Sequence, residues 1–351
     1  MKVILAVPAI VAIVYRAWSR KSLTPIGLVV AALTASIHAI YPSPVPFACL
    51  AVFFLGGTTM TKIKHGIKAR LTVSSSGSAG GEGPRNHVQV LANSVVATIL
   101  IIFHARYFPD SNGSTCFPWG GDILTVGIIA NYAAVAADTY SSELGILSKS
   151  SPRLITSPTL REVPPGTNGG VTLAGLLAGV LGAFTIALTT VLLLPFCGTG
   201  SGHGITASGL DGGKAWGLRE KVLWVVAITV WGVLGSVLDS FLGGLLQASV
   251  VDKRTGKVVE GDGGRKVLIH PGEVISTGIH DGSIRVRRAS AADTAVAPPS
   301  TDADYESRKI ETGYDILDNN AVNVLMALIM SVGGMAVASY VWDMPFLSSL
   351  I

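Results

Sequence analysis

Long apolar stretches separated by polar segments dominate the hydrophobic pattern of this chain. A helix that crosses the roughly 30 Å hydrocarbon core of a bilayer needs about 20 apolar residues. The stretches lack the two-residue alternation of membrane strands, and the pattern predicts an all-α, polytopic bundle of about eight transmembrane helices. The predicted spans are residues 2–18, 25–41, 44–61, 87–107, 122–140, 170–196, 221–247 and 320–346.

The first stretch has the apolar character of a secretory signal. Arg16 and the polar residues up to Lys21 follow it in place of a small-residue cleavage site. We therefore expect residues 3–15 to belong to a retained first span.

Composition supports a membrane protein. Hydrophobic residues make up 49% and charged residues 14% of the 351 positions, whereas soluble domains carry about 25% charged residues. The net charge of +4 is too small to indicate a nucleic-acid partner. The expected environment is therefore the lipid bilayer.

Basic residues occur in every second connection between spans, which predicts one orientation. The positive-inside rule places these connections in the cytosol and both chain termini on the opposite side. The Asn112-Gly113-Ser114 sequon, Cys116 and Cys197 then all lie on the non-cytosolic side. A disulfide between the two cysteines and a pair of free thiols are both compatible with the sequence. The basic connections contain Arg16, Arg20, Lys21; Lys62, Lys64, Lys68, Arg70, Arg85; Lys149, Arg153, Arg161; and Lys253, Arg254, Lys257, Arg265, Lys266, Arg285, Arg287, Arg288.

A polar insert divides the predicted organisation into three parts. Residues 1–251 form a membrane bundle, 252–316 an insert, and 317–351 the last transmembrane helix. Residues 266–284 alternate like a strand, and 288–309 have the composition of a disordered segment. Residues 72–83 have the composition of a flexible linker.

Four polar clusters lie at the predicted cytosolic ends of the spans. The first is the run GGEGPRN, which includes Arg85 and Asn86 and leads into the fourth span. Asn93 lies seven residues after Asn86, so the two amides share a helix face. They are candidate binding residues, and hydrogen bonds between helices are the alternative.

The second cluster is the run DTYSSE, from Asp138 to Glu143, at the end of the fifth span. An acid inside a transmembrane helix is unfavourable by up to about 3 kcal/mol. Two carboxylates at a polar edge suit Mg²⁺, which prefers carboxylate, water and phosphate oxygens. Capping of a following helix is the alternative.

The third cluster combines the run SKSSPRLIT with the glycine-rich turn PPGTNGG before the sixth span. Cations and hydroxyls beside backbone N–H groups at a helix start favour an anion, so we expect a phosphate cradle. A plain turn at the start of a helix is the alternative, and the pattern is not a Walker A motif. The candidate residues are Lys149, Ser150, Arg153, Gly166, Thr167, Asn168 and Gly169.

The fourth cluster joins Asp239 of the seventh span to polar residues at the start of the eighth. Small residues at a spacing of four around Asp239 allow close helix packing and turn this acid towards the bundle interior. An interior acid is a candidate functional residue, and a structural partner for Arg85 or Asn93 is the alternative. The residues at the start of the eighth span are Asp318, Asn319, Asn320 and Asn323.

Together, acids, cations, amides and a glycine-rich turn are the groups that phosphoryl transfer uses. No Ser-His-Asp or Cys-His arrangement suggests acyl hydrolysis. The few charges in the non-cytosolic half argue against an ion path across the membrane.

Four segments resemble the transmembrane protein 19 family, which is similar to the plant phytyl-phosphate kinase. They are GGEGPRNHVQVLAN, ADTYSSELGILSKSSPRLIT with VPPGTNGGVTLAGLLAG, GSVLDSFLGGLLQ, and LDNNAVN. The resemblance covers the third to the eighth span, and the insert after residue 251 departs from compact members. The matching positions are Asn86, Asp138, Glu143, Lys149, Ser150, Arg153, Asn168, Asp239, Asp318, Asn319 and Asn320.

The resemblance implies a kinase that converts an isoprenoid monophosphate to a diphosphate. The expected co-substrate is CTP or ATP, the expected ion is Mg²⁺, and the expected location is the endoplasmic reticulum. We assign metal binding to Asp138, Glu143, Asp239 and Asp318, and phosphate clamping to Lys149 and Arg153. The other candidates bind substrate or nucleotide. The alternative is a non-enzymatic member of the family, a lipid or solute carrier or a regulator.

Overall fold

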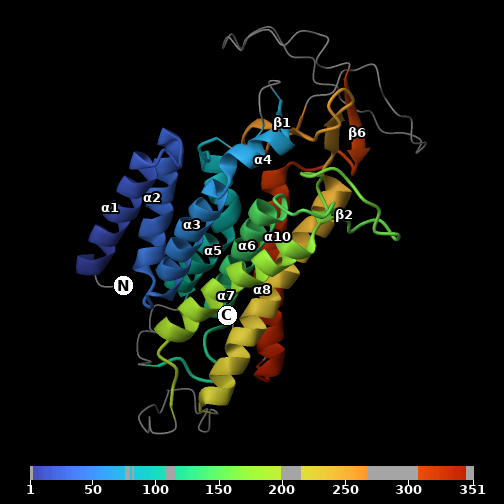
Figure 1. Ribbon diagram of the computed structural model, residues 1–351. Helices are drawn as coiled ribbons and strands as arrows, with labels where there is room; N and C mark the ends of the chain where they lie inside the picture. The colour runs from blue at the N-terminus through green and yellow to red at the C-terminus, as the bar shows by residue number, and fades with distance from the viewer. Residues whose placement is uncertain are drawn as a thin grey trace, which may run out of the picture.

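The computed structural model describes residues 3–75, 80, 83–107, 116–198, 215–267 and 307–344, and helices dominate it (Figure 1). The helices are α1 (Val3–Ser19), α2 (Pro25–Ile40), α3 (Val45–Lys62), α4 (His65–Leu71), α5 (His87–Tyr107), α6 (Ile123–Gly145), α7 (Leu173–Leu193), α8 (Leu218–Leu246), the 3₁₀ turn η2 (Asp262–Gly264) and α10 (Asn319–Val341). The strands are β1 (Val73–Ser74), β2 (Arg153–Leu154), β3 (Gly170–Val171), β4 (Ser249–Asp252), β5 (Val259–Glu260) and β6 (Arg308–Thr312).

All eight predicted spans are helices, which confirms the polytopic helical fold. Within the described residues, six of them are long and apolar enough to cross a membrane: α3, α5, α6, α7, α8 and α10. Helices α1 and α2 are apolar but shorter, at 17 and 16 residues. Helix α6 continues to Gly145, past the predicted end at residue 140, so the polar residues after the apolar stretch are also helical.

Helix α6 is the centre of the bundle and is buried along most of its length. Small residues let its neighbours approach closely, which membrane helices need because lipid gives no hydrophobic drive for their association. A Cβ on Gly232 of α8 would lie 2.6 Å from the Ala133 carbonyl oxygen of α6. A Cβ on Gly235 would meet the side chain of Ala134. Asp239 lies one helical turn after Gly235 on the same face of α8, so it also points into the bundle.

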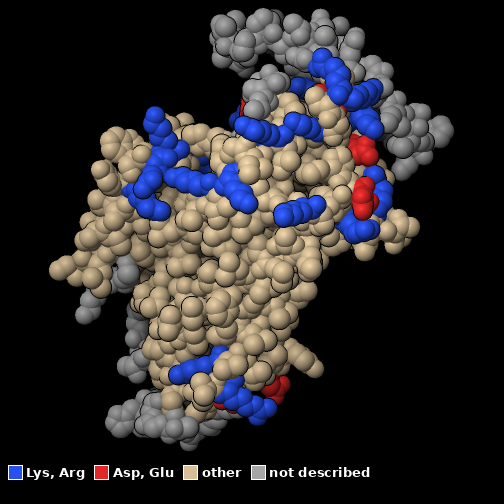
Figure 2. All heavy atoms as spheres, in the orientation of Figure 1, with Lys and Arg blue, Asp and Glu red and all other residues tan. Residues whose placement is uncertain are grey.

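The two ends of the bundle differ in charge. Lys and Arg gather mainly at one end, and a smaller group lies at the other, with few charges on the apolar belt between them (Figure 2). The C-terminal ends of α1, α3, α6 and α8 and the N-terminal ends of α2, α5, α7 and α10 lie at the more basic end (Figure 1). The predicted alternation of basic connections therefore corresponds to one face. That this face is cytosolic stays a prediction.

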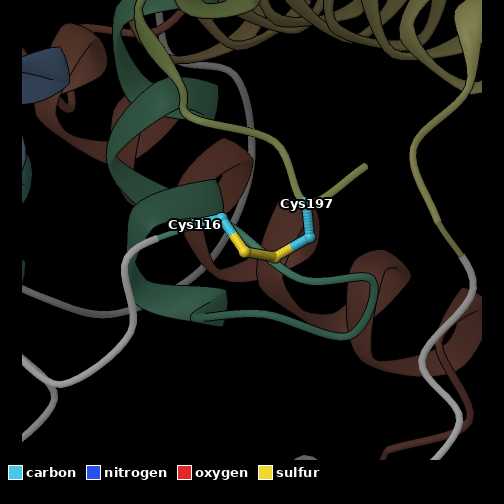
Figure 3. Close-up of a disulfide and its surroundings, with 2 residues drawn as sticks. All are labelled: Cys116 and Cys197. Atoms are coloured by element: carbon cyan, nitrogen blue, oxygen red, sulfur yellow. A yellow bond between two sulfur atoms is a disulfide. The ribbon is translucent and has the colours of Figure 1, made fainter. Parts of the chain in front are cut away.

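A disulfide joins Cys116 and Cys197 at the opposite end (Figure 3). The backbone pairs beside it, since the Phe117 amide donates to the Pro195 carbonyl at 2.7 Å. The structure thus resolves the two alternatives left by the sequence in favour of a bond. The sequon at Asn112 lies outside the described residues.

The described edges of the insert are ordered and fold back on the bundle. Strand β4 pairs antiparallel with β6, and β5 pairs parallel with β1. Arg161, from the loop before α7, donates to Glu311 of β6 at 3.3 Å. The hydrogen bond from Lys309, with that from Arg161, holds the pKa of Glu311 below its ordinary value. The predicted alternation at 266–284 and disorder at 288–309 fall almost entirely outside the described residues, and the three-part division stays a prediction.

Candidate functional site

A cavity of about 710 Å³ opens at the basic end of the bundle. Its volume is in the range typical of small-molecule sites, about 300–1,000 Å³. It gathers fourteen of the predicted site residues, although they come from distant parts of the sequence. They are Arg85, Asn86, Asn93, Asp138, Glu143, Gly166, Thr167, Asn168, Gly169, Asp239, Asp318, Asn319, Asn320 and Asn323.

Asp138 of α6 and Asp239 of α8 form the acidic side of the cavity. Each lies seven residues before the end of its helix. The two carboxyl groups interact electrostatically, and Ser236 hydrogen-bonds Asp138. The Oδ1 atom of Asp239 is buried, with no hydrogen-bond partner in the part of the chain that the structure describes. Because a buried polar atom without a partner is costly, this oxygen is poised to bind a ligand.

Helices α5 and α10 direct their N-termini at the cavity. Asn86 caps α5: its Oδ1 accepts from the Gln89 amide at 3.0 Å, and the Gln89 side chain accepts from the Asn86 amide at 2.9 Å. Asp318 caps α10 by accepting from the Ala321 amide at 2.8 Å. Helix N-termini carry a partial positive charge, which favours an anion. Asn86 and Asp318 thus shape the site through the helix ends, in addition to any direct contact.

Lys68 of the short helix α4 supplies a cation that the sequence patterns did not single out. Its Nζ lies 2.6 Å from Oε2 of Glu143, and Oε1 of Glu143 accepts from the Thr61 hydroxyl at 2.7 Å. Arg85 approaches the same carboxylate at 3.8 Å. Because these contacts occupy both oxygens, Glu143 holds two cations at the cavity wall. Its role as a metal ligand stays a prediction.

The insert forms part of the cavity wall, which is a second feature that the motif analysis missed. The η2 turn lies between α5 and α10: the Gly263 carbonyl accepts from the Asn320 side chain at 3.0 Å. Asp262, Arg265 and Lys266 also line the cavity. The Asp-Gly-Gly run is the kind of glycine-rich polar signal that identified the first cluster, so the same criterion, applied to the insert, would have found it.

Lys149, Ser150 and Arg153 lie outside this cavity, contrary to the expectation that they meet the other candidates. All three are exposed. Arg153 pairs with Glu162 at 3.3 Å and donates to the Leu160 carbonyl at 3.2 Å, so it stabilises its own loop. We therefore do not retain Lys149 and Arg153 as the phosphate clamp of the site, or Ser150 as one of its binding residues.

The glycine-rich turn lines the cavity. Three of its amides are already used: Thr167 N–H donates to the Pro164 carbonyl, Asn168 N–H to the Ser249 hydroxyl, and Gly170 N–H to the Thr167 carbonyl. That the turn binds a phosphate stays a prediction. Gly169 has a φ of +78°, and a Cβ there would lie 2.7 Å from Cα of Gly244 in α8. The turn needs glycine so that it can pack directly on α8.

The two carboxylates of Asp138 and Asp239 suit a magnesium ion only if water and substrate phosphates complete its coordination shell. Among the described residues, no three His, Cys, Asp or Glu side chains group closely enough to form a metal site. Mg²⁺ commonly takes one or two carboxylates and completes its shell with water and substrate phosphates. Asp138 and Asp239, with the unpartnered Oδ1 of Asp239, meet that requirement.

Removing the charge of Glu143 is expected to destabilise the protein. In Glu143→Gln the Lys68 ammonium, which is 8% exposed, loses its carboxylate. Removing one partner of a buried ion pair costs about 3–5 kcal/mol. Because water in the cavity reaches this pair, we expect a smaller loss of about 2 kcal/mol. Thermal unfolding in detergent measures this, and Lys68→Met combined with Glu143→Gln should recover much of the loss. A single variant as stable as the parent chain would contradict the buried pair.

Comparisons with known proteins agree with the motifs. The sequence profile of the family described as "Integral membrane protein DUF92" matches residues 8–331. "Protein PGR" of Arabidopsis thaliana is 33% identical over 324 residues, covering 91% of this chain and 90% of that protein. "Protein VTE6, chloroplastic", from the same plant, is 30% identical over 141 residues, covering 40% of this chain and 38% of that protein.

An uncharacterized membrane protein of Methanocaldococcus jannaschii is 42% identical over 129 residues, covering 34% of this chain and 53% of that protein. No solved structure matches the chain. The family resemblance indicated by the sequence motifs is confirmed by these matches.

Proposed function

Because the chain belongs to the DUF92 family of integral membrane proteins, we propose that it is a membrane kinase that phosphorylates an isoprenoid monophosphate. The nucleoside triphosphate enters the cavity from the aqueous side. The isoprenoid chain stays among the membrane helices, with its phosphate at the cavity rim. The resemblance of the motifs to the plant phytyl-phosphate kinase supports this substrate class.

One observation carries the proposal: a single cavity combines interior acids, amides and cations at the basic end of the bundle. Asp138 and Asp239 stand on one side, and Asn93, Asn320 and Asn323 supply amides. Phosphoryl transfer needs this combination, because positioning and charge stabilisation do most of the work. A cavity for a neutral solute would have no need of two interior acids.

In the proposed reaction an oxygen of the isoprenoid monophosphate attacks the γ-phosphorus of the nucleotide. The new P–O bond forms as the bond from the γ-phosphorus to the β–γ bridging oxygen breaks, and nucleoside diphosphate leaves. Asp138 and Asp239 would hold a Mg²⁺ ion, which would supply charge neutralisation on the phosphate oxygens. Arg85 and Arg265 bind phosphate oxygens, and Asn93 and Asn320 orient them by hydrogen bonds.

The test is direct. Purified protein is incubated with labelled CTP or ATP, Mg²⁺ and a panel of prenyl monophosphates, and labelled diphosphates are separated. We expect transfer to at least one long-chain monophosphate, and thermal stabilisation by nucleotide with Mg²⁺. No transfer and no stabilisation, together with retention of an unmodified lipid or solute, would favour a carrier instead.

Arg265 is expected to contribute to nucleotide binding. It lines the cavity, its side chain is exposed, and Lys266 beside it is already paired with Asp315 at 3.2 Å. A hydrogen bond to a charged group is worth about 1.5–3 kcal/mol, so Arg265→Gln should raise the KM for nucleotide at least about tenfold. The matched control is Lys257→Gln, a cation of the same insert that does not line the cavity. Equal KM values for both variants would remove Arg265 from the site.

A further inference from the structure

We propose a second binding site, for the phosphate group of a membrane phospholipid, in a small cavity between the C-terminal ends of α1 and α3. The cavity has a volume of about 170 Å³ and is separate from the large one. It is lined by Arg16, Arg20, Ser22, Phe54, Thr58, Thr59 and Lys62. This volume equals that of about six waters at roughly 30 Å³ each, which leaves room for one phosphate group.

The charges that line this cavity are all positive. Arg20 directly follows the last residue of α1, and its amide donates to the Arg16 carbonyl at 3.1 Å. The two cations therefore lie one turn apart and repel each other. Within the described residues, none of Arg16, Arg20 and Lys62 forms an ion pair. Three cations around one cavity are stabilised when an anion occupies it.

The donors available to that anion are the cations and Ser22. The hydroxyl groups of Thr58 and Thr59 donate to the Leu55 carbonyl at 3.1 and 2.7 Å, so they offer only acceptor lone pairs. Guanidinium groups match phosphate oxygens in geometry and bind them in pairs. The site is therefore built for a phosphate group.

The position of the cavity favours a lipid as the source of the phosphate. It lies where two apolar helices end, and Lys and Arg gather over this end in Figure 2. Tyr15 and Trp18 of α1 are each 63% exposed beside it, and such aromatic residues mark the membrane–water interface. Phe54 gives the cavity an apolar wall. Basic pockets at this depth between helices bind lipid headgroups.

A phosphate bound in the small cavity would also stabilise the position of Arg85 in the wall of the large cavity. The Ser22 carbonyl accepts from the Arg85 amide at 3.0 Å, and the Thr24 amide donates to the Arg85 carbonyl at 3.0 Å. Thr24 and Arg85 both line the large cavity. One backbone connection thus runs from the lipid-phosphate site to a cation of the candidate active site.

Lipid binding tests the proposal on the full chain purified in detergent. Native mass spectrometry measures retention of phosphatidylglycerol and of phosphatidylcholine, and a separate arm measures thermal stabilisation by inorganic phosphate. The variant is Arg16→Gln with Arg20→Gln, and the control is Lys21→Gln with Lys64→Gln, two exposed lysines of the same end outside the cavity. Each arginine that loses its charge-assisted hydrogen bond to the phosphate should weaken binding by about tenfold, so the variant should bind phosphatidylglycerol roughly 100-fold less tightly.

The outcomes separate the sources of the phosphate. Loss of phosphatidylglycerol in the arginine variant, with the lysine control unchanged, supports the lipid site. An effect of the arginine variant on stabilisation by inorganic phosphate alone supports a phosphate site but assigns it to a soluble anion. Equal losses in the variant and the control, or no loss in either, would overturn the proposal. All four residues are exposed, so these changes should leave the fold intact.

Discussion

Replacing Asp138 or Asp239 by asparagine is expected to reduce phosphoryl transfer by at least about 10²-fold, the loss typical when one preorganised charge-stabilising group is removed. Both carboxylates line the large cavity, and Oδ1 of Asp239 is buried with no hydrogen-bond partner in the described structure. An amide keeps the shape of the side chain but no longer neutralises a cation. Initial rates with labelled nucleotide and the best prenyl monophosphate measure the effect.

The same two variants should remain folded, which separates a catalytic role from a structural one. A buried carboxylate without a partner is unfavourable for the protein alone, and an amide is cheaper to bury. Asp239→Asn should therefore unfold at the same temperature as the parent chain or higher. It should also lose most of the additional stabilisation that nucleotide with Mg²⁺ provides.

Glu162→Gln serves as the matched control, since this acid is 61% exposed and pairs with Arg153 outside the cavity. Its activity should equal that of the parent chain. Full activity in both aspartate variants would show that neither carboxylate takes part in the reaction. Activity lost only together with the fold would return Asp138 and Asp239 to a structural role.

Loss of the Cys116–Cys197 disulfide is expected to lower the free energy of unfolding by about 4.5 kcal/mol. The bond closes a loop with a sequence separation of 81 residues, and the chain-entropy account gives about 4.5 kcal/mol for a loop of this length. The loop contains α6, the central helix, and α7. The bond therefore restrains, in the unfolded chain, the segments that form the centre of the bundle. Thermal unfolding of Cys116→Ser with Cys197→Ser in detergent measures the effect.

Reductant is the matched control for this variant. It should lower the unfolding temperature of the parent chain and leave that of the double variant unchanged. Turnover at low temperature should be retained, because the disulfide lies beside the start of α6 and the end of α7, whereas the large cavity lies at the opposite ends of these two helices. A double variant as stable as the parent chain would show that the paired backbone at Phe117 and Pro195 holds this end without the bond.

Sequence alone determined the spans, because the length of an apolar stretch is what allows a helix to cross a bilayer. Predicted and observed boundaries differ by a few residues, as at 122–140 against Ile123–Gly145. It also determined that Asp239 points inward, since small residues around it follow the helical period. These properties are local, and a pattern along one helix contains them.

Only the tertiary structure decided which polar groups meet. Lys68 became the partner of Glu143, and the η2 turn of the insert entered the cavity wall. Lys149 stayed outside the cavity. The amides of Thr167, Asn168 and Gly170 were used in hydrogen bonds within the turn and to Ser249, and Gly169 packed against Gly244 of α8. Each of these outcomes depends on contacts between segments far apart in the chain, and no local periodicity specifies their spacing or direction.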